Sequence, residues 1–262
     1  METRTTRPTK KKKRINLPIS LLVILLVIFG VLQVAHAHKV HSLNQTIQTA
    51  QAATTKQKAE NQKLQTEVSE LQEEIKAPIK AYGNKTRATL KQAKLNDHLI
   101  LQTDERWANQ KYGWGQFSTV DKNACAIASL SMINAYWDDS KELSVNEVLK
   151  WAGNDYFTDY GTSWNIFPAF AQKYGYTYKD LGSNLSAALP YLKKGIPVVA
   201  SVHPGLFTTV GHILVLSHAD DKGIQVLDPN DNALKKHSLT PFPNDTIQEE
   251  LSHLWVFEKT KK

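Results

Sequence analysis

The sequence contains a single cysteine, Cys125, in 262 residues. One thiol excludes a disulfide within the chain. The chain also lacks a spaced set of cysteines and histidines of the kind that binds zinc, so we expect neither a metal nor another cofactor. The role of this one thiol is therefore the first question that the sequence raises.

Acidic residues are almost missing from the N-terminus, where residues 1–14 hold seven lysines and arginines against Glu2. This cluster accounts for most of the formal net charge of +7. The rest of the chain is nearly neutral and has no spread of basic side chains interleaved with aromatic ones, which excludes a nucleic-acid surface. We expect no nucleic-acid partner.

Charged residues are absent from Ile15 to Ala35. An apolar run of about 20 residues is long enough to cross a hydrocarbon layer of ~30 Å as a helix. Because the basic cluster precedes it, the positive-inside rule predicts a cytoplasmic tail (1–14), a transmembrane signal anchor (15–35) and an extracellular remainder. The alternative is a secreted protein cleaved near Ala37, since residues 35–37 read Ala-His-Ala, which matches the A-x-A cleavage site of a signal peptide. The apolar run, however, exceeds the length of about 7 to 15 residues that is usual for the apolar region of a signal peptide.

Glycine, tryptophan, phenylalanine and tyrosine are all missing from residues 40–77. A seam of residues instead recurs at alternating steps of three and four, which predicts a coiled-coil stalk that holds the following domain away from the membrane. Asn61 falls at an a position, which favours a parallel homodimer, and Pro78 ends the helix. A single solvated spacer helix stays open as an alternative, because the seam is polar in its centre. The seam consists of Leu43, Ile47, Ala50, Thr54, Gln57, Asn61, Leu64, Val68, Leu71 and Ile75.

Residues 78–96 have the composition of a linker with one short helix, and aromatic residues become frequent after them. We therefore place a globular domain at residues 97–262, a common domain size. Its helical patterns come first, at 123–137, 145–152, 162–175 and 185–195, and its strand patterns follow, at 196–202, 212–219, 224–230 and 254–259. The sequence DDKG (220–223) predicts a hairpin turn. Helices segregated from an antiparallel sheet make an α+β domain.

Cys125 lies in the first turn of the first of these helices, after a polar Asp-Lys-Asn start. The unpaired backbone N–H groups and the dipole at a helix start favour a thiolate, which is a nucleophile. An unpaired exported thiol is a liability unless it is buried, bridged to another chain or used. A small buried hydrophobic residue is the alternative reading.

A thiol nucleophile needs a base and a group that orients the base, and the hairpin GHILVLSHADDKGIQVLDPN (211–230) offers both. His212 opens its first strand and Asp228 lies at the end of its second. Because a tight turn sets the outer ends of a hairpin side by side, His212 and Asp228 are expected within side-chain reach.

The order of QTDERWANQKYGWG, NACAIASLSMIN, GIPVVASV and GHILVLSHADDKGIQVLDPN resembles the bacteriocin-processing, double-glycine-type cysteine peptidases and their stand-alone relatives, over about residues 98–258. The resemblance implies a papain-like fold with a catalytic triad of Cys125, His212 and Asp228. It also implies an upstream glutamine that donates to the oxyanion, which would be Gln102, with Gln116 as a nearer alternative. Many relatives read Gly-Cys-Gly where this chain reads Ala-Cys-Ala.

The sequence and the resemblance together predict a membrane-anchored extracellular cysteine peptidase or amidase. Its partners would be the membrane, through residues 15–35, and a peptide or cell-wall peptide substrate. Two other functions stay open: a non-catalytic envelope adaptor that uses a papain-like domain for binding, and a transglutaminase-like acyl transferase. The residues do not distinguish water from an amine as the acceptor.

Overall fold

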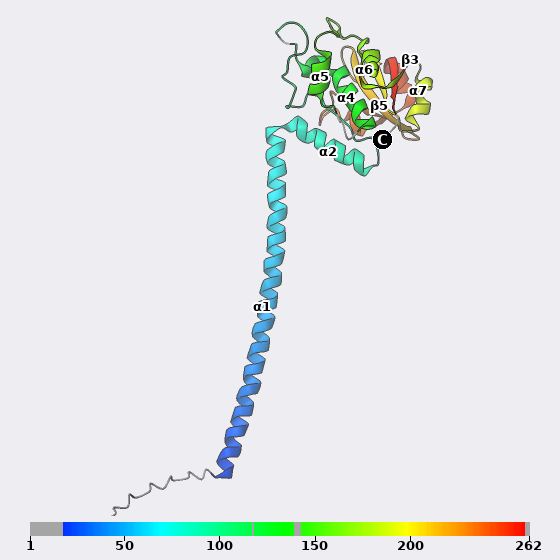
Figure 1. Cartoon of the computed structure of the whole chain (residues 1–262). Helices are drawn as coiled ribbons and strands as arrows, with labels where there is room; N and C mark the ends of the chain where they lie inside the picture. Colours follow the sequence, from blue (N-terminus) through cyan, green and yellow to red (C-terminus); the bar gives the residue numbers. More distant parts are fainter. Residues whose placement is uncertain (1–17, 117, 139–142, 260–262) are drawn as a thin grey trace, which may run out of the picture. The chain divides into compact units, whose positions relative to one another are not determined.

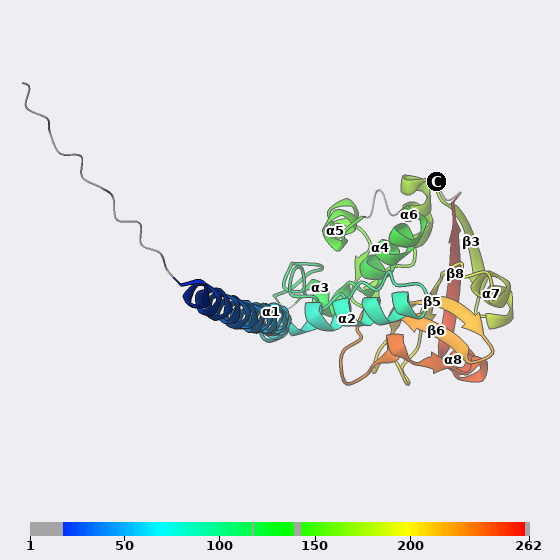
Figure 2. The same ribbon diagram turned by 90° about the horizontal axis from the view of Figure 1, so that it is seen from below.

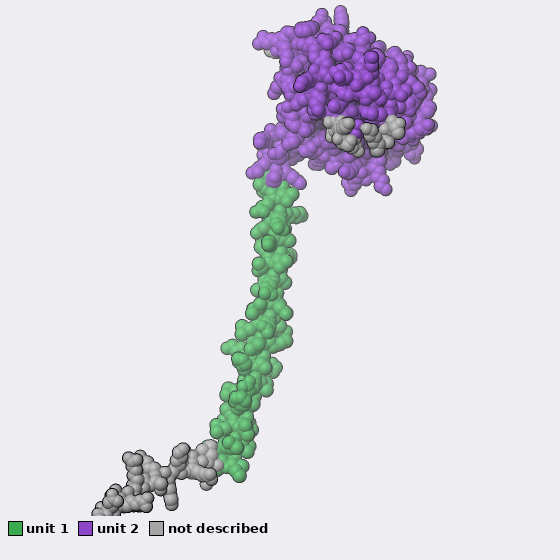
Figure 3. Space-filling model, viewed as in Figure 1, with its two compact units in different colours: residues 1–68 green, residues 69–262 purple. Residues whose placement is uncertain are grey.

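The computed structural model describes residues 18–116, 118–138 and 143–259. The predicted basic tail, 1–14, lies outside the described residues, as do the first three positions of the predicted anchor. The chain forms two compact units, residues 1–68 and 69–262 (Figure 3). We describe each by itself.

Helix α1 (Ile19–Lys76) runs without a break through the apolar segment and the predicted stalk (Figure 1). All of α1 is described, and none of its side chains is buried. Its N-terminal part is long and apolar enough to cross a membrane by length and composition. The helix stops where the sequence predicts, because the residue before Pro78 is excluded from the helical region: Ala77 has φ −143° and ψ 71°.

Proline then opens a second helix, α2 (Pro78–Gln92), in the segment expected to be a linker with a short helix. Proline suits a first helical position because it has no N–H to satisfy. The Glu105 carboxylate accepts the backbone N–H groups of Ile79 (2.8 Å) and Lys80 (3.0 Å), which are the exposed donors of the first turn. One face of α2 is buried, through Gly83, Thr86 and Leu90. This helix is therefore part of the second compact unit, which begins before residue 97.

The four helices predicted for the domain all form. Ser144 caps α5 with a capping box completed by Glu147, and Gly175 ends α6 in the left-handed conformation. The helices are α3 (Val120–Asn123), α4 (Cys125–Trp137), α5 (Val145–Ala152), α6 (Ile166–Tyr174), α7 (Leu185–Leu192) and α8 (Asn244–Glu250), with a 3₁₀ turn η2 (His237–Leu239).

Six antiparallel strands form the main sheet in the order β3-β8-β4-β5-β6-β7, and β1 (Phe157–Thr158) and β2 (Gly161–Thr162) form a separate small hairpin. The four predicted strands are its centre, β4 (Val198–Val202), β5 (His212–Asp220), β6 (Gly223–Leu227) and β8 (Leu251–Glu258). The edge strands β3 (Thr177–Gly182) and β7 (Pro241–Phe242) were not predicted, and β3 interrupts the simple order of helices followed by strands.

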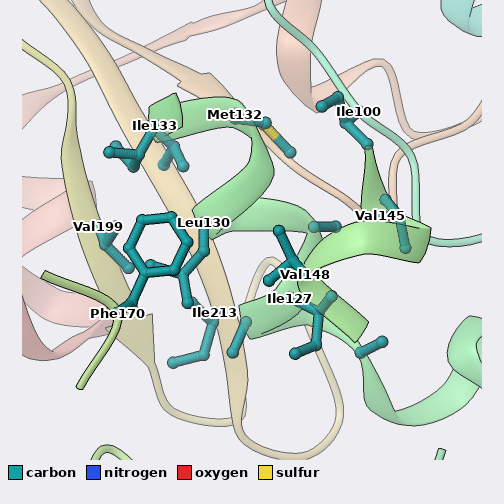
Figure 4. Close-up of a cluster of buried hydrophobic side chains, with 14 of the residues drawn as sticks. Ile100, Ile127, Leu130, Met132, Ile133, Val145, Val148, Phe170, Val199 and Ile213 are labelled. Carbon is teal, nitrogen blue, oxygen red and sulfur yellow. The ribbon is translucent and has the colours of Figure 1, made fainter. Parts of the chain in front are cut away.

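The sheet carries a hydrophobic cluster on each face, because its central strands are buried on both sides. Helix α4 lies against β5 on one face and α7 lies on the other (Figure 2). Figure 4 shows side chains of α4 and α5 packed together with Phe170, Val199 and Ile213. Helix α4 is buried nearly all round, from Ala126 to Ala135, which fixes its first residue firmly against the sheet. The α+β fold class predicted from the sequence is confirmed.

Candidate active site

Cys125 is the first residue of α4, as the sequence predicts, and it is half-buried. The preceding Ala124 has φ −103° and ψ 29°, a conformation that needs no glycine. Ala124 and Ala126 are themselves fully buried. The Ala-Cys-Ala sequence therefore fits this backbone, and both alanine side chains are packed into the interior.

The environment of Cys125 favours the thiolate. Burial alone would raise the pKa of the Cys125 thiol, but its hydrogen bond to His212, the charge of that imidazole and the backbone N–H groups of Ile213 and Ala126 together bring the pKa below the ordinary value. The influences that favour the thiolate thus come from one side chain, the His212 imidazole, and from two backbone N–H groups.

His212 and Asp228 meet as the hairpin predicts. The N–H at Nε2 of His212 donates to Oδ1 of Asp228 at 2.7 Å, and both side chains are buried. Since Nε2 is bound to the carboxylate, the other ring nitrogen, Nδ1, is the one that serves the thiol. An irregularity in pairing at Ser217 shifts the register of β5 against β6 by one residue, from Ala219 opposite Ile224 to Val215 opposite Leu227, and so moves Asp228 towards the His212 end of β5.

The two charges in this pair stabilise each other. Burial opposes the imidazolium, but the hydrogen bonds and charges of Asp228 and Cys125 raise the pKa of His212 to about 10. Burial likewise opposes the carboxylate of Asp228, yet the hydrogen bonds from His212, His237 and the backbone of Asn230 hold its pKa far below the usual range. At neutral pH the site therefore favours a thiolate, an imidazolium and a carboxylate in contact.

The structure separates the two glutamines. Gln102 is buried, its backbone N–H donates to the carbonyl of Pro229 (2.8 Å), and its Nε2 donates to the carbonyl of Asp121 (2.7 Å), one turn before Cys125. Its Oε1 is buried without a hydrogen-bond partner. Gln116 is exposed in a loop. Gln102 is thus hydrogen-bonded to the loop that follows Asp228 and to α3, the short helix that precedes the nucleophile helix α4.

One residue at the centre of this site was not anticipated. The N–H at Nδ1 of His237, in η2, donates to Oδ2 of Asp228 at 2.7 Å, so the carboxylate receives a histidine on each oxygen. In the sequence His237 lies in a polar Lys-Lys-His-Ser stretch nine positions after Asp228, and no motif marks it. Among the described residues no group of three histidine, cysteine, aspartate or glutamate side chains is placed to hold a metal ion.

A half-buried thiol at a helix start, with its pKa lowered by a strand histidine that is hydrogen-bonded in turn to a buried carboxylate, is the arrangement of a nucleophile, its base and an orienting group. On an α+β fold this describes a cysteine peptidase-like hydrolase. The chain belongs to the Peptidase_C39 like family, which matches residues 99–248, more than half of its length. The resemblance and the type of enzyme predicted from the sequence are both confirmed.

Solved structures similar to this chain include the peptidase domain of Streptococcus ComA, a bi-functional ABC transporter involved in a quorum sensing pathway (15% identity, 53% of this chain and 94% of that one, TM-score 0.42). A Bacillus anthracis protein described as a C39-like peptidase is 16% identical (53% and 90%, TM-score 0.40). A double glycine motif protease from an AMS/PCAT transporter, in complex with the leader peptide, is 19% identical (60% and 96%, TM-score 0.38). No curated protein matches the chain.

Proposed function

We propose that this protein is a membrane-anchored extracellular cysteine peptidase or amidase, and that it hydrolyses amide bonds of peptides or cell-wall peptides with a triad of Cys125, His212 and Asp228. The observation that carries the proposal is the buried hydrogen bond between His212 and Asp228 (2.7 Å), together with the influence of the His212 imidazole on Cys125, where it lowers the pKa of the thiol. Membership of a peptidase family supports the peptidase activity.

In the proposed reaction the Cys125 sulfur forms a bond to the carbonyl carbon of the substrate, and the carbonyl oxygen takes up the negative charge. His212 gives its Nδ1 proton to the leaving nitrogen as the carbon–nitrogen bond breaks, which leaves a thioester on Cys125. His212 then removes a proton from water, the hydroxide adds to the thioester carbon, and the thiolate departs. Asp228 keeps the imidazole oriented and stabilises its positive charge throughout.

The oxyanion needs fixed donors close to the sulfur. The backbone N–H of Cys125 is available at the start of α4, because the first N–H groups of a helix have no partner within it. We assign the second donor to Gln102. Its Nε2 carries two hydrogens and donates one to the carbonyl of Asp121, which leaves the other for the oxyanion. Donors held in place before the reaction stabilise a developing charge more effectively than mobile ones.

The anchor and the orientation belong to the same proposal. The N-terminal part of α1 has the length and composition of a membrane-spanning helix. The seven basic residues before it support a cytoplasmic N-terminus and an extracellular domain. In α1 the apolar seam residues Leu64 (52% exposed), Leu71 (51%) and Ile75 (84%) are uncovered in the single chain, which supports pairing with a second copy.

Reactivity of the thiol tests the enzyme directly, because Cys125 is the only cysteine in the chain. The full chain in detergent is treated with iodoacetamide between pH 5 and pH 9, and the rate is followed by mass spectrometry for wild type, His212→Gln and His212→Ala. Wild type is expected to react with an apparent pKa well below the value of about 8.5 for free cysteine, and both variants to move towards that value. A wild-type pKa near that of free cysteine, unchanged in the variants, contradicts the proposal.

Turnover distinguishes the remaining functions. Incubation with peptides or purified cell-wall peptides should release new carboxylate and amine ends in wild type and not in Cys125→Ala. A product that instead carries an added amine on its new carbonyl identifies an acyl transferase, and binding without turnover by a reactive thiol identifies an adaptor.

A further inference from the structure

Asp228 is held by more than its catalytic partner. Its Oδ1 accepts from His212 and from the backbone N–H of Asn230 (2.8 Å), and its Oδ2 accepts from His237 (2.7 Å). Its own backbone N–H donates to the hydroxyl of Ser238 (3.0 Å). The carboxylate is fully buried, so the donors that reach it fix the direction of both oxygens.

The two residues that hold Asp228 from the far side, His237 and Ser238, are positioned by a second buried carboxylate. Asp231 accepts the backbone N–H of His237 on Oδ1 (3.0 Å) and that of Ser238 on Oδ2 (2.8 Å). The ring of His237 also packs edge-on against Phe207 and Phe242, at 5.1 and 6.1 Å between ring centres. His237 is therefore set by its backbone and by its ring faces together.

Asp231 is in turn bonded to helix α2. The hydroxyl of Tyr82 donates to Oδ2 of Asp231 at 2.9 Å, across 149 positions of sequence. Burial raises the pKa of the Tyr82 hydroxyl, and the charge of Asp231 adds to this effect, so the hydroxyl keeps its proton and acts as a constant donor. Helix α2, with Tyr82, lies outside the part of the chain that matches the family, residues 99–248.

We propose that Tyr82 and His237 are positioning residues, and that α2 orients the catalytic carboxylate through the series Tyr82, Asp231, His237 and Asp228. This inference rests on the proposed function of the triad. Asp228 accepts the Nε2 proton of His212 and so orients the imidazole, whose Nδ1 faces the thiol. If the Asp228 side chain becomes more mobile, the interaction between the imidazolium and the thiolate weakens. Helix α2, which follows the stalk in the sequence, then contributes to the geometry of the active site.

The measurement is the rate of Cys125 alkylation by iodoacetamide at a pH one unit below the apparent pKa found for the wild-type thiol, divided by the rate at pH 9, for the full chain in detergent. At pH 9 the thiol is largely ionised in every variant, so the ratio reports the thiolate fraction at the lower pH and is independent of the protein concentration. One unit below the wild-type pKa, a rise of half a unit to one unit in the pKa of the thiol lowers the thiolate fraction by about 3 to 10 fold.

Tyr82→Phe and His237→Ala are expected to lower this ratio by about 3 to 10 fold, and His237→Asn, whose amide nitrogen can stand in for Nδ1, to restore most of it. Tyr176→Phe is the matched control: it too loses a buried hydroxyl that bonds a side chain, Asn134 (2.9 Å), but far along α4 from the thiol. Its ratio should equal that of wild type.

A ratio for folded Tyr82→Phe equal to that of wild type overturns the inference, and so does a His237→Asn ratio no higher than that of His237→Ala. Should either variant fail to fold, Asp231→Asn supplies the same test, since it weakens the hydrogen bonds that join Tyr82 to the backbone of His237. A wild-type thiol that itself behaves as free cysteine is a different result, because it refutes the triad rather than its positioning.

Discussion

His212 and Asp228 are 16 positions apart in the sequence, and their side chains are joined by a buried hydrogen bond of 2.7 Å. The hairpin brings them together, but a regular hairpin closed at Asp220 and Gly223 would place Asp228 opposite Val215. The pairing irregularity at Ser217 shifts this by one residue, so that continuing the observed register sets Asp228 opposite Leu214. The geometry of the pair thus depends on a local distortion of the strand.

Replacing Asp228 by Asn should destabilise the fold in a pH-dependent way. The pKa of Asp228 is far below its ordinary value of 3.8, so the stabilisation from its charge is present above that pH and is lost as the pH falls. The pKa of His212 is raised from 6.5 to about 10, so the stabilisation from its proton is full below pH 6.5 and is lost as the pH rises towards 10.

We therefore expect the free energy of unfolding of wild type to exceed that of Asp228→Asn by about 3 kcal/mol between pH 4 and 6.5, where both groups are charged. The difference should shrink on either side of this window. Denaturant titration followed by tryptophan fluorescence measures it cleanly, because all six tryptophans lie in the domain after residue 100. A difference that is constant from pH 4 to pH 10 would show that the two charges do not interact.

Gln102→Ala should lower peptide hydrolysis by about 10²-fold while the domain stays folded, because one oxyanion donor is removed. Gln116→Ala is the matched control, and its exposed position predicts wild-type turnover. Both variants should keep the low apparent pKa of Cys125, since neither glutamine is among the groups that set it. Loss of activity in Gln116→Ala alone would reverse the assignment.

The signal anchor should be retained. An N-terminal affinity tag is expected to stay attached to the domain and to remain in the membrane after alkaline carbonate extraction, since the uncharged run is too long for a usual signal peptide. A membrane-impermeant maleimide should label Cys125 on intact cells, which tests the orientation. Recovery of a soluble domain that begins near His38 would instead establish cleavage.

The stalk should pair in parallel, because β-branched residues occupy its apolar a positions Ile47, Val68 and Ile75, and leucine occupies most of its d positions. In a Cys125→Ala background, Leu64→Cys at a d position is expected to form a disulfide-linked dimer under mild oxidation. Thr66→Cys, at an f position on the opposite face of the helix, is the control and should stay monomeric. Equal cross-linking at both positions would favour a single spacer helix.

The sequence predicted those features of the domain that depend only on a few neighbouring residues. The capping box at Ser144, the glycine stop at Gly175 and the DDKG turn each depend on a few neighbouring residues, and all three form. The edge strand β3 was missed because its mixed, partly exposed sequence becomes a strand only by pairing with β8, some 75 positions later.

Helix α2 was interpreted as a linker for a similar reason. Its sequence is polar, and only Gly83, Thr86 and Leu90 are buried, which is too narrow a stripe to stand out in a segment of mixed composition. At Gly83 an added Cβ would lie 3.2 Å from a side-chain carbon of Leu101, so this glycine allows the close packing of α2 on the domain. A contact of this kind is visible only once both segments are folded.

The sequence by itself determined the single thiol at a helix start, the histidine and aspartate at the two ends of a hairpin, and the uncharged run behind a basic tail. These features are local, and composition and spacing carry them. The tertiary structure alone decided that Gln102 rather than Gln116 lies near the nucleophile helix. It also decided that His237 donates to Asp228 and that Tyr82 donates to Asp231, which positions His237. Those contacts join residues that are separated in sequence, and His237 and Tyr82 donate to Asp228 and Asp231 because a buried carboxylate needs donors for the oxygens that water can no longer reach.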